Sequence, residues 1–140
     1  MDASDRKRWF RAVVLLAGVY FVIAIAFGTF AGWAVSNSVR ETWNRLAFLA
    51  SGIAFAVHIG YEHLRLGNSS RITASHASIA VALGAFALAL KANIHDLASA
   101  SGYRPRMLIA LVAWPLLTGV PAFIVALVLA AALTLRRGST

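Results

Sequence analysis

Residues 10–35 read FRAVVLLAGVYFVIAIAFGTFAGWAV, an apolar run in which Arg11 is the only charged residue. An α-helix needs about 20 apolar residues to cross the hydrocarbon core of a bilayer, which is about 30 Å thick. Lipid offers no hydrogen-bond partner to an open backbone, so a stretch of this kind is expected to be helical throughout. Residues 10–35 are therefore predicted to form a transmembrane helix.

Three further apolar segments have a comparable length. They cover residues 43–64, 72–90 and 107–135, and short segments connect them. Short connections join helices that run antiparallel to one another. We therefore predict an all-α membrane protein in which residues 1–140 form a single four-helix transmembrane bundle with up-down-up-down topology.

The composition of the chain agrees with this class. Apolar residues make up 60% of the sequence and charged residues 13%, which is outside the range of soluble domains. The net charge is +8, but the basic residues cluster at the ends of apolar segments. That placement is typical of anchoring in a lipid bilayer, so we expect lipid as a partner and no nucleic acid. The absence of cysteine excludes disulfides, thiolate metal sites and iron–sulfur ligation.

The distribution of basic residues predicts the orientation in the membrane, because Lys and Arg accumulate on the cytoplasmic side. With the N-terminus inside, eight of the 13 basic residues are cytoplasmic. These are Arg6, Lys7, Arg8, Arg11, Arg65, Arg71, Arg136 and Arg137. The outer group is Arg40, Arg45, Lys91, Arg104 and Arg106. We therefore predict a multi-pass protein of the cell membrane with both termini in the cytoplasm.

Polar residues of the second predicted span lie on one face of the helix. Their spacing is 7, 7, 4 and 3 residues, and they are Asn44, Ser51, His58, Glu62 and Arg65. Ionisable groups are costly in lipid. This face is therefore expected to point into the bundle, toward a partner subunit or into a water-filled cavity.

The third predicted span carries a second polar face that includes Thr73, His76 and Lys91. His58 lies ten residues before Asn68 in the connecting turn, and His76 lies eight residues after it. At 1.5 Å of rise per residue, the two imidazoles have similar depths. The predicted intramembrane polar cluster consists of His58, Glu62 and His76, with Arg65 and Arg71 at its cytoplasmic mouth. Its secondary positions are Asn44, Ser51 and Lys91, while His63 is assigned to the headgroup region.

Three chemical uses of this cluster remain open. A carboxylate and two imidazoles can exchange protons, which suits a proton or ion relay. His58 and His76 are also candidate ligands for a divalent metal, although the spacing from Glu62 differs from the His-Glu-x-x-His signature. The same histidines could be axial ligands of a b-type haem, with Arg65 or Arg71 meeting its propionates. Against all three stands a structural role, in which a buried Glu–His pair only ties two helices together.

The stretch from Gly60 to Leu64 resembles the Gly-x-Arg-His-Leu segment that follows a haem-ligating histidine in the membrane-anchor subunits of succinate dehydrogenases. The resemblance covers residues 58–67 only. Glu62 stands in place of the arginine, Gly67 stands in place of an aspartate, and four spans replace three. We therefore carry over no functional residue from that family.

The sequence thus favours a small oligomeric transport or channel protein, or an accessory subunit of a larger membrane complex. The alternative is a haem-binding or metal-binding redox protein that uses His58 and His76. A classical enzyme is not expected, because no catalytic triad, phosphate-binding glycine loop or histidine box is present. Ala24, Gly28 and Gly32 in the first span have four-residue spacing, which favours close helix packing, either within the chain or between copies.

Overall fold

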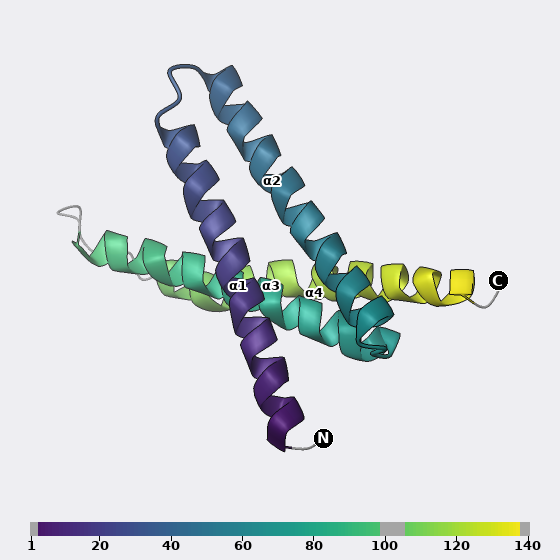
Figure 1. Cartoon of the computed structure of the whole chain (residues 1–140). Helices are drawn as coiled ribbons and strands as arrows, with labels where there is room; N and C mark the ends of the chain where they lie inside the picture. Colours follow the sequence, from purple (N-terminus) through teal and green to yellow (C-terminus); the bar gives the residue numbers. More distant parts are fainter. Residues whose placement is uncertain (1–2, 99–105, 138–140) are drawn as a thin grey trace.

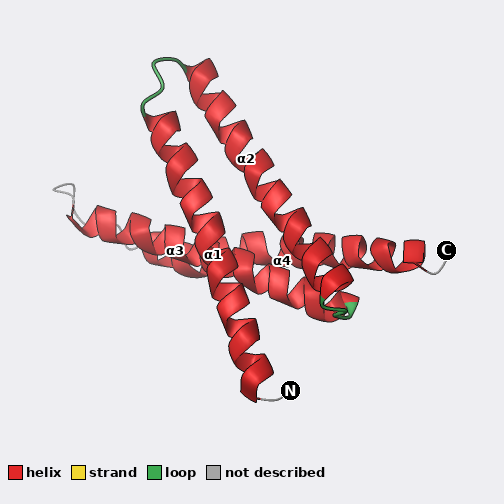
Figure 2. Cartoon of the chain, viewed as in Figure 1, coloured by secondary structure: helices red, strands yellow, loops and turns green. Residues whose placement is uncertain are grey.

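The computed structural model describes residues 3–98 and 106–137, and this part of the chain is helical apart from short connections (Figures 1 and 2). The helices are α1 (Ala3–Gly32), α2 (Asn37–Gly60), α3 (Ser70–Ala98) and α4 (Arg106–Arg137). A π-helical turn, η1 (Tyr61–Arg65), continues α2 without a break. The predicted all-α fold with four helices is therefore confirmed.

Three of the four helices are long and apolar enough to cross a membrane. These segments are Trp9–Gly32, Ser70–His95 and Met107–Leu135. Among the described residues, α2 does not qualify, because Asn44, Arg45 and His58 lower its mean hydropathy. A four-helix membrane bundle is compatible with these helices, whereas the crossing of α2, the topology and the side of the termini stay predictions. Arg104, which entered the charge count, lies outside the described residues.

Several helix ends differ from the sequence prediction. α2 begins at Asn37, within the segment expected to be a loop, because Ser36 caps it by accepting a 3.3 Å hydrogen bond from the Val39 amide. α3 continues to Ala98, well past the predicted end at residue 90. Asn93 explains this extension: it is buried and donates to the carbonyl oxygens of Ala89 (2.9 Å) and Met107 (2.8 Å). The end of α3 is thereby tied to the start of α4.

The helices form two antiparallel pairs that cross each other, α1 with α2 and α3 with α4 (Figure 1). α3 and α4 make the most extensive contact, and α1 packs against both α2 and α3. α2 has few contacts with α3 or α4, and it approaches them only near its C-terminal end. The α2–α3 connection is thus a corner, so the polar faces of these two helices do not oppose each other along their length.

Small residues allow the close contacts between helices. The α3–α4 interface buries Ala74, Ala77, Ala126 and Ala130 completely. Ser78 Oγ also donates a 2.7 Å hydrogen bond to the Gly119 carbonyl across this interface. Without much hydrophobic driving force in lipid, such packing and interhelical hydrogen bonds hold helices together.

The crossing of α1 over α3 is made at Gly84. A side-chain carbon at Gly84 would lie 3.1 Å from Tyr20 Cβ and 3.3 Å from the Ala17 carbonyl oxygen. Gly28 and Gly32 behave differently, since a side-chain carbon at either would meet nothing within 4 Å. Within the described residues these two glycines therefore make no close helix contact, and their contact with another chain stays a prediction.

A larger side chain at the crossing point is predicted to destabilise the fold. Gly84→Leu forces α1 away from α3 and is expected to lower the free energy of unfolding in detergent by about 1–3 kcal/mol. Gly18→Leu is the matched control, because Gly18 is exposed and a side-chain carbon added there would meet nothing within 4 Å. Equal stability of the two variants in a denaturant titration would contradict the crossing at Gly84.

Candidate functional site

The site is built where α2 passes into the π-helical turn η1. The wider turn brings two consecutive polar side chains inward, so Glu62 is only 3% exposed and His63 8% exposed. π-helical turns inserted in α-helices are frequent at functional sites. The chain then reverses at Gly67, whose φ of +68° is in the left-handed region that favours glycine. The Asn68 amide donates back to the Glu62 carbonyl oxygen at 3.2 Å and closes the corner.

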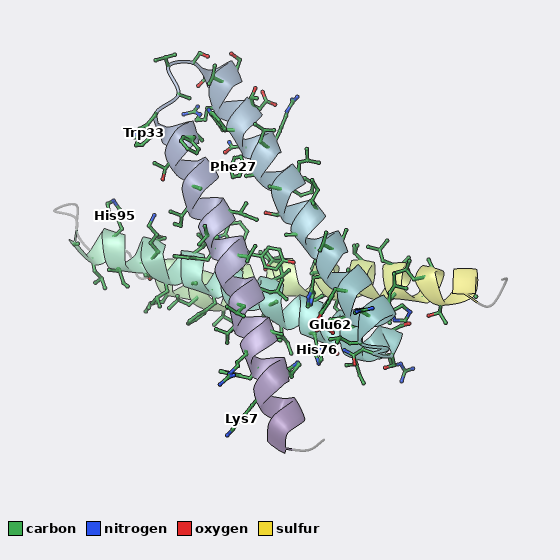
Figure 3. The ribbon with its side chains drawn as sticks, viewed as in Figure 1. Lys7, Phe27, Trp33, Glu62, His76 and His95 are labelled. Atoms are coloured by element: carbon green, nitrogen blue, oxygen red, sulfur yellow. The ribbon has the colours of Figure 1, made fainter. Side chains whose placement is uncertain are left out.

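The Glu62 carboxylate is the centre of the site (Figure 3). His76 Nδ1 lies 2.7 Å from Glu62 Oε2 and 2.9 Å from Oε1. Asn68 Nδ2 donates a further hydrogen bond of 3.1 Å to Oε2. The predicted convergence of these side chains from two helices is therefore present, and Asn68 is a member that the sequence did not identify.

His58 completes the cluster from the last turn of α2. Its Nε2 atom lies 3.8 Å from Glu62 Oε1, and its side chain is 3% exposed. This nitrogen is buried and has no hydrogen-bond partner. Buried polar atoms are nearly always paired, so an unpaired nitrogen beside a carboxylate calls for an explanation.

α1 also reaches the cluster, through an aromatic contact. The Trp9 indole and the His76 imidazole have ring centroids 5.5 Å apart, with their planes inclined by 50°. The sequence places Trp9 at the membrane interface, but it gives no sign of this contact because 66 residues separate the two rings. The site therefore combines three helical segments, α1, α2 with η1, and α3.

The basic and secondary positions lie outside the group of hydrogen-bonded side chains around Glu62. Arg65 and Arg71 are exposed near the corner, and within the described structure neither forms an ion pair with Glu62. Asn44 and Lys91 are exposed, and only Ser51 is half-buried. Because α2 and α3 diverge away from the cluster (Figure 1), the described residues form no continuous polar path along these two helices.

His63 is buried in the protein, while its depth in a membrane stays a prediction. Its Nδ1 is 2.9 Å from the Asn68 carbonyl oxygen, and its Nε2 is 2.9 Å from Thr134 Oγ1 on α4. Both ring nitrogens are therefore used, which makes His63 a tie between the corner and α4. A partner on α4 is 71 residues away in the chain and leaves no signal in the local sequence.

The residues present do not fit a haem held between His58 and His76, because the Glu62 carboxylate lies between the two imidazoles. Neither histidine lines any of the three cavities that the described residues form most clearly. Among the described residues, no group of three or more His, Cys, Asp or Glu side chains is arranged to hold a metal ion.

Comparison of the chain with protein-family models, curated proteins and solved structures found no match. The local resemblance of residues 58–67 to succinate dehydrogenase anchor subunits thus gains no support from a wider similarity.

Removal of the His63 side chain is predicted to cost stability. His63→Ala leaves the Asn68 carbonyl and the Thr134 hydroxyl without their partner, which is expected to lower the free energy of unfolding by about 1–3 kcal/mol. The matched control is His95→Ala, since His95 is exposed. If both variants unfold at the same detergent-denaturant midpoint, His63 is not a tie.

Proposed function

We propose that this chain is a four-span integral membrane protein that couples proton binding at Glu62 to the passage of a solute or ion. It acts as an oligomer or within a larger membrane assembly. The observation that carries this proposal is a carboxylate that is 3% exposed and is surrounded by imidazole and amide groups instead of a fixed positive charge.

A group of this kind is poorly explained by stability alone. An ion pair removed from water gains little, because the desolvation of both charges offsets their attraction. Arg or Lys would give a permanent counter-charge, whereas His76 is charged only when it holds a proton. The charge state of the pair therefore depends on proton supply, which is what a coupling site requires.

The geometry supports a short proton path. In the ionised pair, His76 Nδ1 donates its proton to the Glu62 carboxylate across 2.7 Å. In the neutral pair, the Glu62 hydroxyl donates to that same nitrogen. From Glu62 the next acceptor is His58 Nε2, which has no other partner and needs to move closer than its present 3.8 Å. His76 is 16% exposed and forms the end of the path nearest to solvent.

The surfaces left open by a single chain support an assembly. Phe48 on α2 is 84% exposed, and the polar residue Asn44 on the same helix is exposed as well. A helix with this polarity crosses lipid at high cost unless another helix covers its polar residues. Gly28 and Gly32 of α1 are open to close contact with a neighbouring helix. A second copy or another subunit at these faces would complete the membrane domain.

The crossing of α2 can be tested in a chain without cysteine. A membrane-impermeant maleimide applied to intact cells is expected to label Ser38→Cys, at the start of α2, and to label Ser69→Cys only after permeabilisation. Both serines are exposed, so accessibility depends on the side of the membrane. Labelling of both variants from the same side would show that α2 does not cross and would overturn the four-span topology.

The coupling role of Glu62 predicts a specific loss. In proteoliposomes with an imposed pH gradient, Glu62→Gln should reduce proton flux about tenfold or more, since the amide preserves shape but does not exchange protons. Glu41→Gln is the control, because Glu41 is exposed and pairs with Arg45 on the same helix. Unchanged flux in Glu62→Gln, accompanied by a lower unfolding midpoint, would identify the cluster as a structural tie.

A further inference from the structure

A cavity of about 410 Å³, open to the surface and lined in part by exposed residues such as Phe48, lies where the two helix pairs cross, separate from the cluster around Glu62. Every helix contributes to its wall, with Tyr20 from α1, Phe55 from α2, Leu88 from α3 and Pro121 from α4. Small-molecule sites in proteins have volumes of about 300–1,000 Å³ and lie preferentially between helices in helical folds. The size and the position of this cavity are therefore those of a binding site.

The lining of the cavity selects a neutral, apolar occupant. None of its lining residues is charged, and its hydroxyl-bearing residues are Tyr20, Ser51 and Thr118. Thr118 already donates a 2.8 Å hydrogen bond to the Trp114 carbonyl, and the Tyr20 hydroxyl is buried without a partner. A water molecule needs two to four polar partners to be stable in such a site. Apolar atoms are therefore a better complement to this wall than water or an ion.

The cavity exists because the residues around the crossing are small. Gly84 allows α1 to approach α3, while Gly52, Ala24 and Ala122 leave the space beside this contact unfilled. Gly52 lines this space, and a side-chain carbon added to it would meet nothing within 4 Å, so it is the position from which we expect a larger residue to fill the cavity.

The cavity approaches the cluster around Glu62 along α2 and α1. Phe55 lines the cavity one helical turn before His58, and it packs against both buried clusters of the fold. On α1, Tyr20 lines the cavity and belongs to a buried cluster that Trp9 packs against, and the Trp9 ring packs on His76. An occupant of the cavity thus touches Phe55, one helical turn from His58, and Tyr20, on the helix that carries Trp9.

We propose that this cavity binds a neutral, predominantly apolar small molecule. The second part of the proposal rests on the proposed function: this molecule is the solute whose passage is coupled to proton binding at Glu62. The absence of charge in the wall excludes cationic and anionic compounds as preferred ligands, since a charge buried there would have no partner.

The test uses a neutral photoreactive arene, 3-trifluoromethyl-3-phenyldiazirine, with the full chain in proteoliposomes and peptide mapping by mass spectrometry. Labelling of cavity residues such as Tyr20 and Ser51 is expected to saturate and to be displaced by excess naphthalene. Gly52→Leu fills the cavity and should reduce this labelling to the level of lipid-facing positions. Gly18→Leu is the control and should leave it unchanged, because Gly18 is exposed, does not line the cavity, and a side-chain carbon added there would meet nothing within 4 Å.

Three outcomes overturn the binding site: labelling that does not saturate, labelling that persists in Gly52→Leu, or labelling of the cavity only by a phospholipid with a diazirine in its acyl chain. The last would make the occupant a lipid chain. Glu62→Gln separates the two proposals. Saturable labelling with lost proton flux supports both, whereas saturable labelling with unchanged flux supports the binding site and overturns the coupling.

Discussion

The hydrogen bonds of the Glu62 carboxylate to His76 and Asn68 tie the first helix pair to the second. α2 has few other contacts with α3, so this polar corner fixes the end of α2 on the second pair, while α1 packs on α3 at the crossing. In a membrane, no water is available to replace these partners if the pairs separate. The same interaction therefore orients the corner and places an ionisable group in the protein interior.

The crossing of the pairs has a second origin, in residues with little or no side chain. Alanines fill the α3–α4 interface, Gly119 approaches Ala82, and Gly84 meets the backbone of α1. Large side chains instead point outward, as expected when the surrounding solvent is lipid. Because close approach occurs at single crossing points and not along whole helices, the pairs diverge on both sides and a cavity is left beside the contact.

The cluster around Glu62 and the cavity differ in the kind of side chains that they contain. The cluster around Glu62 holds ionisable groups and no large void, while the cavity holds apolar surface and no charge. Phe55 lines the cavity one helical turn before His58, so it is the lining residue of α2 that comes nearest in sequence to the cluster.

The sequence by itself determined the helical class, the helix number and the meeting of His58, Glu62 and His76, because apolar length, polar periodicity and distance from a short turn are local properties. It did not determine the crossing of the pairs, the burial of His63, or the Trp9–His76 contact. Each of these joins residues far apart in the chain, and each depends on which small residues let two backbones approach. Only the tertiary structure decided that the polar faces of α2 and α3 meet at one end and part at the other.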